Sequence, residues 1–528
     1  MKYINFLIIL LSVGLFSCKK VIDLLPESNL NSAAYYKTEA EVRTGLNGCY
    51  NGLLAPMNNE WSITELRSDN SKQGFTGSQS SINIDYNTLD MFFPAPGNSG
   101  IYTYWLNSYN NIRNANIILQ KLSVTYDPGA GAVTFGTTDI PISDSVRKQL
   151  AGEALFIRGY HYFNLVRLYG GVFLVHTPIT AAVAKSINRS SVADIYKLIL
   201  ADLQTAAGYL SAKKFTQIAS ADIGRVSSWA AKSLLGKVYL TLNRKAEAIT
   251  QLQDVITNSG YSLVTAAGTA ATAYANLFSI TNEMNSEMLF AVRYKAGGLG
   301  LGSRFGNDFA ALSSGSTIIN GSGQGLNYPT NDLDTTYMLT VTPAVTFDPR
   351  RATNIAIFGS GPAAVPYVRK YVSPVVLTND GESDWPVIRF ADVLLMMAEA
   401  QGFTASSIAL INQIRTRAGV PVLPATVTTV ALFEQALSTE RRLEFAFENQ
   451  RWFDLLRFNV TLTTITAEQT IRNHLAREYA RHYALYPAPT ATLAQLQALV
   501  DANHLLLPIP QYEIDTNTQL VIAQNPGY

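Results

Sequence analysis

The feature that most constrains the fold is a helical spacing of apolar residues that recurs along the chain and is clearest within residues 227–259. Residues 227–242 and 245–259 each place apolar side chains on one helical face. A short turn at Asn243 and Arg244 reverses the chain, so the two helices run antiparallel. Alanines such as Ala230 and Ala248 allow them to pack closely. Stacked helix pairs of this kind are typical of tetratricopeptide repeats.

Similar helical patterns occur before and after this pair. We assign four candidate pairs, at residues 39–122, 144–209, 227–259 and 390–457. Two long stretches, 56–104 and 260–388, are instead rich in Gly, Ser, Asn, Thr and Pro, and we expect irregular loops there. Long loops on a rigid scaffold usually carry function. The predicted fold is therefore mainly α, with irregular tetratricopeptide-type helix pairs and a loop-rich ligand-binding region.

The N-terminus has the pattern of a bacterial export signal that ends at a lipidated cysteine. Lys2 gives a positive start, residues 4–16 form an apolar run, and a small residue precedes Cys18. The run is too short to cross a bilayer core of about 30 Å as a helix. We predict a lipoprotein signal peptide at residues 1–17 and a lipidated tether at 18–34, with the lipid on Cys18. A plain signal peptide and an uncut membrane anchor are the alternatives.

Charge and cysteine content exclude several classes of protein. Lys2 is the only charged residue of the signal, so the mature chain carries 39 basic and 39 acidic residues. Without a basic excess, there is no electrostatic basis for binding nucleic acid. Cys49 is the only cysteine besides Cys18, so we expect no disulfide and a buried thiol. No CxxC, HxxH or HExxH spacing occurs, which predicts no metal site and no cofactor.

The densest charged motif, residues 440–454, invites an enzymatic reading because paired carboxylates can act as acid and base. Glu440, Glu444 and Glu448 share one helical face, but arginines are interleaved with them. Guanidinium partners lower carboxylate pKa values, whereas a general acid needs a raised pKa. We predict a structural ion-pair network and no catalytic residue. The glycine run at 297–302 fits no nucleotide-binding pattern and is predicted to be a flexible loop.

Blocks distributed along the chain resemble the SusD/RagB family of outer-membrane nutrient-uptake lipoproteins from Bacteroidetes. These blocks are DLLPES at 23–28 with residues 40–50, EALFIRGYHYFNLVRLYG at 153–170, IRFADVLLMMAEA at 388–400 with residues 411–419, ERRLEFAFE at 440–448 with residues 451–457, and LPIP at 507–510 with the ending QNPGY. They occur in the family's order and cover nearly the whole mature chain.

The resemblance implies a SusD-like body at residues 35–528, with an N-terminal part to about residue 260 and a C-terminal part from about 261. It implies a lipid-anchored position at the outer membrane, facing the cell surface. It also implies two partners: a SusC-like TonB-dependent β-barrel transporter, and an oligosaccharide or peptide ligand that this protein captures.

Ligand-binding residues are expected in the irregular stretches. Proteins bind sugars with an aromatic platform and nearby hydrogen-bonding side chains. The residues predicted to do this are Trp61, Arg67, Asp69, Tyr86, Phe309 and Tyr328. Their neighbours Asn70, Phe75, Tyr294, Arg304, Phe305, Asp308 and Asn327 are further candidates, whereas Trp105 and Trp229 fall on helical stripes and are interpreted as scaffold.

Two other functions compete with nutrient binding. A surface glycoside hydrolase requires two unpaired carboxylates facing a cleft. A purely structural docking protein requires only the helix pairs and no small ligand.

Overall fold

A helical scaffold dominates the computed structural model, which describes residues 35–74, 83–265, 268–341, 344–361, 364–486, 490–517 and 519–528. Cys18, the tether and Phe75 lie outside the described residues. The first half of the chain forms α2 (Glu39–Asn51), α3 (Leu54–Thr64), α4 (Ile84–Asp90), α5 (Ser99–Lys121), α6 (Asp144–Tyr169), α7 (Ala181–Ala184), α8 (Val192–Tyr209), α9 (Ser228–Thr241) and α10 (Lys245–Asn258).

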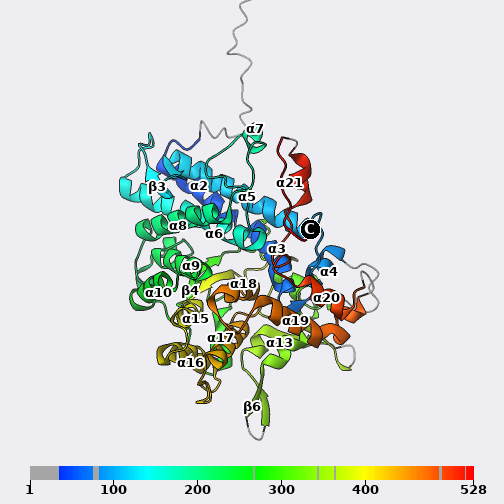
Figure 1. Ribbon diagram of the computed structural model, residues 1–528. Coiled ribbons are helices and arrows are strands. Elements are labelled where there is room, and N and C mark those ends of the chain that lie inside the picture. Colours follow the sequence, from blue (N-terminus) through cyan, green and yellow to red (C-terminus); the bar gives the residue numbers. More distant parts are fainter. Residues whose placement is uncertain are drawn as a thin grey trace, which may run out of the picture.

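The second half contains shorter helices and then a compact helical group, as Figure 1 shows in green to red. These helices are α11 (Ala270–Leu277), α12 (Phe305–Phe309), α13 (Asn331–Thr336), α14 (Arg351–Asn354), α15 (Phe390–Gln401), α16 (Ala405–Ala418), α17 (Val430–Glu444), α18 (Arg451–Thr461), α19 (Ala467–Glu478), α20 (Leu493–Leu499) and α21 (Gln511–Thr516). The predicted mainly helical fold is confirmed.

The predicted helix pairs stack on one another through α6, α8, α9, α10 and α15, each of which packs against the next. Serine side chains cap three of these helices: Ser143 begins α6, Ser191 begins α8 and Ser227 begins α9. Each hydroxyl accepts a hydrogen bond from a backbone N–H of the first turn, which is the usual way to satisfy a helix start.

The close contact between α9 and α10 depends on a glycine as well as on the predicted alanines. A Cβ atom at Gly236 would lie 2.8 Å from Cδ2 of Leu252, closer than real Cβ contacts occur. Ala230 and Ala248 are fully buried at the same pair. Small side chains therefore allow this pair to stack against α8 on one side and α15 on the other.

Two expectations about helices were wrong in detail. In the predicted pair at 144–209 the first helix is α6, but it is buried on nearly all sides, chiefly by α8 and α5, so it lacks the single apolar face that the helical spacing predicts. The stretch at 56–104 is not mainly irregular, because it holds α3, α4 and the start of α5. Residues 60–64 of α3 are all buried, so no polar face marked that helix in the sequence.

Among the described residues, five two-stranded antiparallel sheets lie on the helical scaffold. They pair β1 (Ser71–Lys72) with β5 (Tyr328–Pro329), β2 (Val124–Asp127) with β3 (Ala132–Phe135), β4 (Met288–Val292) with β10 (Trp385–Arg389), β6 (Met338–Val341) with β7 (Ala344–Phe347), and β8 (Ile355–Phe358) with β9 (Val365–Val368). All but the β2–β3 pair involve residues 260–389, so the long irregular stretch consists of loops and small sheets. The β6–β7 hairpin projects from one end of the molecule (Figure 1).

The two halves of the chain share one hydrophobic core. Lys72 of β1 pairs in register with Tyr328 of β5, and the N–H of Leu507 donates to the carbonyl oxygen of Leu168 at the end of α6. The final helix, α21, then lies beside α5 (Figure 1), where Tyr512 packs on Tyr102. The C-terminal segment thus returns to the first helices.

Within the described residues, no helix is long and apolar enough to span a membrane. Cys49 is fully buried in α2, as predicted, and burial raises the pKa of its thiol to about 12.

Candidate functional site

Three of the predicted ligand-binding aromatics meet in space although they come from distant parts of the chain. Trp61 lies on α3, Tyr86 on α4 and Phe309 on α12. The ring of Trp61 is 5.1 Å from that of Tyr86 and 5.6 Å from that of Phe309, measured between centroids. We call these three side chains the aromatic cluster.

Most of this cluster faces inward. Trp61 is 1% exposed and Phe309 is fully buried, so neither ring offers an open platform. Beneath them, Phe305 contacts Trp385, and Tyr371 stacks on Trp385 at an interplanar angle of 11°. Trp385 is therefore core. Tyr86 is the member of the cluster that is partly exposed to solvent.

An ion pair interacts electrostatically with Tyr86. Nε of Arg304 lies 2.8 Å from a carboxylate oxygen of Asp308, one helical turn further along. Burial raises the pKa of Asp308 above its ordinary value, although Arg304 opposes that rise. The Arg304 side chain is 48% exposed. Tyr86 and Arg304 together form a solvent-facing surface over the buried aromatic cluster, which we call the tyrosine–arginine face.

The predicted glycine loop leads into this face. Gly297, Gly298 and Gly300 all adopt positive φ angles, which favour glycine. The carboxylate of Asp380 accepts hydrogen bonds from the backbone N–H groups of Gly297 and Gly298, at 2.8 and 2.9 Å. The loop conformation is thus held by the Asp380 carboxylate and by a β-bridge between Lys295 and Leu301.

Left-handed backbone at residues other than glycine is concentrated in the same region. Within residues 278–384 such residues are Met284, Ser313, Ser322, Asn327 and Asn379. Backbone in sparsely populated conformations costs on the order of 1 kcal/mol or more and is often found at ligand sites. This concentration makes the loop region a candidate ligand site.

Two predicted ligand-binding residues are interior side chains instead. Arg67 is fully buried, with its guanidinium 4.3 Å from the ring of Trp452 and a hydrogen bond to the carbonyl oxygen of His504. Tyr328 is 5% exposed, and its hydroxyl accepts a hydrogen bond from the N–H of Leu312. We correct both assignments, because neither side chain can reach a ligand in solution.

Asp69 lies in a different place from the aromatic cluster, on the wall of a cavity of about 350 Å³ that we call the charged pocket. Arg451 donates hydrogen bonds to both carboxylate oxygens of Asp69, at 2.7 and 2.9 Å. Burial alone would raise the pKa of Asp69, but Arg442 and Arg451 outweigh it and hold the pKa well below its ordinary value. Asp69 therefore has partners within the protein.

The 440–454 motif forms an ion-pair network, as predicted, but with partners that the sequence did not indicate. Glu440, Glu444 and Glu448 pair with cations from other segments, namely Arg350, Lys370, Arg389, Arg415 and Arg417. Arg441, which is interleaved with these glutamates in the sequence, forms ion pairs with Asp454 and Asp392 instead. The reason is helical geometry: adjacent residues on a helix do not face each other.

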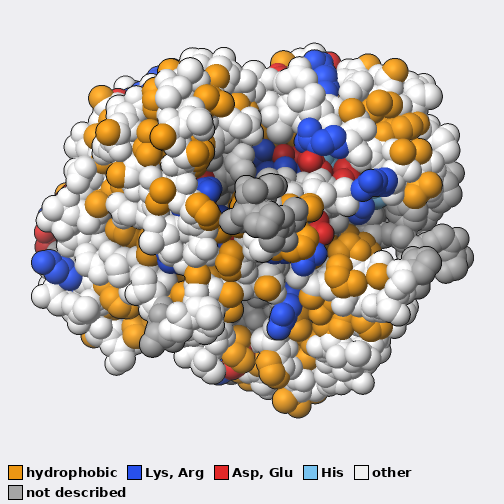
Figure 2. All heavy atoms as spheres, turned by 90° about the horizontal axis from the view of Figure 1, so that it is seen from below, with side chains coloured by type: hydrophobic (Ala, Val, Ile, Leu, Met, Phe, Trp, Pro, Cys, Tyr) orange, Lys and Arg blue, Asp and Glu red, His pale blue; other side chains and the backbone are white. Residues whose placement is uncertain are grey.

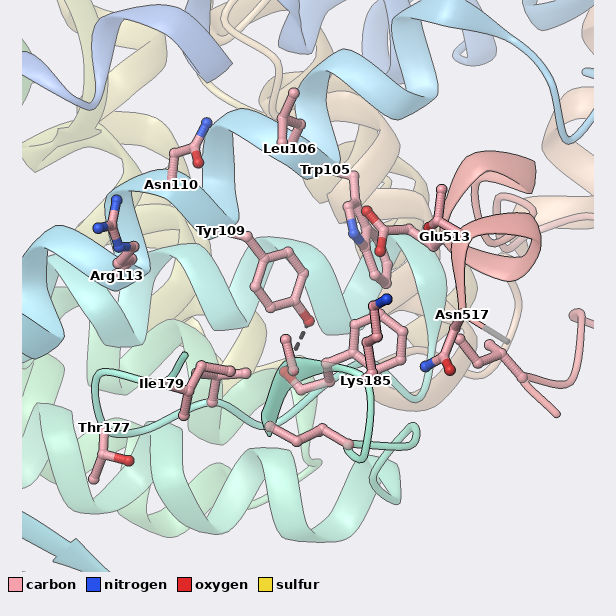
Figure 3. Close-up of a pocket in the computed structure, with 16 residues that line it drawn as sticks. Trp105, Leu106, Tyr109, Asn110, Arg113, Thr177, Ile179, Lys185, Glu513 and Asn517 are labelled. Atoms are coloured by element: carbon pink, nitrogen blue, oxygen red, sulfur yellow. Dashed lines mark hydrogen bonds between the residues drawn. The ribbon is translucent and has the colours of Figure 1, made fainter. Parts of the chain in front are cut away.

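A second cavity of about 350 Å³ opens between α5, the segment after α6, and α21. Figure 3 shows Trp105 and Tyr109 entering it from α5 and Glu513 from α21. Phe173 completes an aromatic wall, 5.6 Å from Trp105 between centroids, and its carbonyl oxygen accepts the hydroxyl hydrogen of Tyr109. We call this cavity the α5 pocket.

Polar groups also line the α5 pocket, among them Asn110, Arg113 and Lys185. Burial raises the pKa of Glu513, although the Trp105 indole N–H donates to it. Our assignment of Trp105 to scaffold therefore missed a pocket wall. The available signal was the four-residue spacing of Trp105, Tyr109 and Arg113, which places an arginine on the aromatic stripe of one helix.

Within the described residues, no group of three or more His, Cys, Asp or Glu side chains is arranged to hold a metal ion.

Comparison with known proteins gives two family matches, one in each half of the chain. A family model described as the SusD family matches residues 349–528. Another, described as starch-binding associating with outer membrane, matches residues 22–240.

Curated relatives are similar over most of the chain. SusD-like protein P38 of Formosa agariphila is 26% identical over 501 residues, which is 86% of this chain and 90% of that protein. SusD-like protein P2 of the same organism is 25% identical over the full length of both proteins.

Solved structures share the fold. A laminarin-binding SusD-like protein superposes with a TM-score of 0.68 at 24% identity, over 93% of this chain and all of the other. Surface glycan-binding protein A of Bacteroides thetaiotaomicron, solved with laminarihexaose, gives a TM-score of 0.66 at 16% identity, over 92% and 99% of the two chains.

Proposed function

The chain belongs to the SusD family, and from that premise we propose that it captures an oligosaccharide at the outer membrane and passes it to a SusC-like TonB-dependent transporter. One family model is described as starch-binding and associating with the outer membrane. Two proteins of the same fold are named for laminarin or glycan binding. The names describe binding and not catalysis, so we propose capture without turnover.

The observation that supports a binding site best is the tyrosine–arginine face. A partly exposed aromatic ring packs on a buried ring, and a half-exposed guanidinium interacts with it electrostatically. A sugar ring stacks on an aromatic face while its hydroxyls bond to charged side chains. Single residues of the loop region 278–384 adopt left-handed backbone conformations, which would preorganise these loops for a ligand.

The proposal is tested by titrating the purified protein with laminarihexaose and maltohexaose in a calorimeter, and with a peptide library of similar length. We expect one of the glucans to bind with no release of reducing ends. Tyr86→Ala should weaken that binding about 3- to 10-fold, the loss of one aromatic contact. Arg304→Ala should weaken it by a similar factor.

Tyr209→Ala is the matched control, because Tyr209 is an exposed tyrosine on α8 that lines neither cavity. It should leave the affinity unchanged. Arg113→Ala tests the α5 pocket as the alternative location. If Arg113→Ala abolishes glucan binding and Tyr86→Ala does not, the glycan site is the α5 pocket and our placement is wrong.

Delivery to a transporter requires a separate experiment. The tagged protein, extracted from native outer membranes in mild detergent, should carry a β-barrel protein with it at constant ratio. Deletion of the chain should slow uptake of the bound glycan without removing the barrel from the membrane. Unchanged uptake in the deletion strain would contradict the delivery role.

The hydrolase alternative would need Glu283 as its acid, but this carboxylate is paired with a cation, which does not meet the requirement for unpaired carboxylates. Glu283 lies beside Arg293, which also binds Asp384. Burial and the charge of Asp384 raise the pKa of Glu283 to about 7, a value suited to a general acid. Release of reducing sugar by the wild-type protein, and its loss in Glu283→Gln, would establish hydrolysis instead of binding alone.

A further inference from the structure

The charged pocket is a cavity without an assigned role. Its walls come from α13, α17, α18, α19 and the residues that precede β1. It lies toward the end of the molecule that bears the β6–β7 hairpin, and in that face basic and acidic side chains gather in a hollow (Figure 2). It shares no lining residue with the α5 pocket, and neither Tyr86 nor Arg304 lines it. A ligand here would therefore be separate from one at the tyrosine–arginine face.

The walls carry more positive than negative charge. Three guanidiniums, those of Arg442, Arg451 and Arg477, face two carboxylates, those of Asp69 and Asp332. Burial alone would raise the pKa of Asp332, but hydrogen bonds and charge from His474, Arg442 and Arg477 hold it well below its ordinary value. Both carboxylates are thus ionised at neutral pH, and the lining has one positive charge in excess.

The cationic wall is held rigidly. Arg451 is fixed by its two bonds to Asp69. Arg442 bonds to Asn70, Thr336 and Asp332, at 3.0, 3.2 and 3.2 Å. Both arginines are more than nine-tenths buried. A ligand would meet these charges already in place, so little entropy would be lost in ordering them.

Arg477 is the group available to a ligand. Its Nε and Nη2 atoms bind the two oxygens of Asp332 at 2.6 and 2.8 Å. Its third nitrogen, Nη1, has no hydrogen-bond partner among the residues that the structure describes, and the side chain is 50% exposed. Guanidinium groups pair preferentially with carboxylate and sulfate oxygens.

The other residues that line the charged pocket favour a polar ligand. It includes Ser438, Thr439, Thr470 and the amides of Gln435 and Asn473, with Ile465 as the apolar exception. Hydroxyls and amides suit a ring that carries several hydroxyl groups. A volume of about 350 Å³ is ample for a single sugar ring, since liquid water takes about 30 Å³ per molecule.

We propose that the charged pocket binds a single sugar ring bearing one acidic group, a carboxylate or a sulfate, with the acidic group on Arg477 and the hydroxyls on the α17 and α19 side chains. This site is additional to the proposed capture of a glycan and does not depend on it.

D-Glucuronate, D-glucose and inorganic sulfate are the probes, each titrated into the full protein by calorimetry at low and at high salt. We expect glucuronate to bind at least ten-fold more tightly than glucose, with an affinity that falls as salt screens the charge. Arg477→Ala should reduce glucuronate binding at least ten-fold. The control is Arg481→Ala, an exposed arginine just after α19 that does not line the pocket.

Equal binding of glucose and glucuronate would overturn the acidic part of the proposal, and so would an unchanged affinity in Arg477→Ala. Sulfate that binds as tightly as glucuronate would overturn the sugar part. Asn473→Ala gives a second test of the ring contacts, with an expected loss of about 3-fold. Laminarihexaose binding should be unaffected by both variants, so failure here is distinguishable from failure of glycan capture.

Discussion

At the scale of single residues, the protein interior contains many charged side chains. Glu444 is fully buried and pairs with Arg350, Arg389 and Arg417 from three other segments. Burial alone would raise its pKa, but the three guanidiniums lower it to about 2. Ionised Glu444 is therefore part of the folded state over the whole physiological pH range.

Acid should weaken the fold through Glu444. Its folded pKa lies below the ordinary value of 4.5, so its contribution is complete above about pH 4.5 and is lost as the pH falls toward 2. The loss is on the order of 3 kcal/mol from this group. Glu444→Gln should be less stable than wild type at pH 7, by about 3–5 kcal/mol, and should lose less stability between pH 5 and pH 3. Urea unfolding followed by tryptophan fluorescence measures both.

Asp139→Asn is the control for Glu444→Gln, because Asp139 is exposed and should keep the wild-type pH dependence. An identical pH slope in Glu444→Gln and wild type would show that the network does not depend on this carboxylate.

Glu65 should behave in the opposite way. Burial raises its pKa to about 7, and one of its oxygens has no hydrogen-bond partner among the described residues. The other accepts the N–H of Asn449 at 2.7 Å, which a glutamine can also do. Ionisation of Glu65 therefore lowers the stability of the folded protein as the pH rises from about 4.5 through 7. Relative to wild type, Glu65→Gln should be about 1–3 kcal/mol more stable at pH 8 than it is at pH 5, measured by the same unfolding assay. A gain that is equal at both pH values would contradict the assignment.

At the scale of elements, the sequence predicts best the helices with one apolar face. The pair formed by α9 and α10 follows from the spacing of Leu234, Val238 and their neighbours, and its boundaries are close to those observed. Helix α3 does not follow, because burial on all sides removes the alternation on which periodicity depends. The ion-pair partners of Glu444 do not follow either, because they come from segments 27 to 94 residues away.

The close contact between α9 and α10 is open to a direct test at Gly236. Gly236→Val would place a branched side chain against Leu252, and we expect a loss of about 1–3 kcal/mol from overpacking. Gly208→Ala, on α8 with nothing within 4 Å of the added Cβ, should instead gain about 0.5–1 kcal/mol. Thermal unfolding of both variants distinguishes close packing from helix propensity. Similar shifts in both would mean that Gly236 marks no close approach.

At the scale of the whole molecule, part of the candidate site could be predicted. Composition and loop position were enough to select Trp61, Tyr86 and Phe309, which do converge. They were not enough to separate exposed from buried side chains, because Trp61, Phe309, Arg67 and Tyr328 are buried and only Tyr86 of the cluster is partly exposed. Exposure depends on which distant segments cover a loop, and local composition does not record that. The α5 pocket was missed for a related reason. Its walls combine α5 with α21, a helix near the C-terminus, and local composition does not show that these two helices meet.

The predicted lipid anchor belongs to this scale because it fixes where the whole protein works. Cys18→Ala should remove the lipid and release the protein from the membrane fraction, whereas Cys49→Ala should leave it there. Cell fractionation with mass measurement of the mature N-terminus checks both. A Cys18→Ala protein that stays membrane-bound and uncleaved would show that the apolar run holds it.

The ion pairs of Asp69 have a consequence for biogenesis. Asp69 and Arg451 are 382 residues apart, yet each is buried and each neutralises the other. Before residue 451 has been synthesised, the N-terminal half can leave Asp69 in water but cannot bury it without a large cost. Folding around Asp69 must therefore be completed after nearly the entire polypeptide is available, so the N-terminal half cannot finish folding as an independent unit during synthesis.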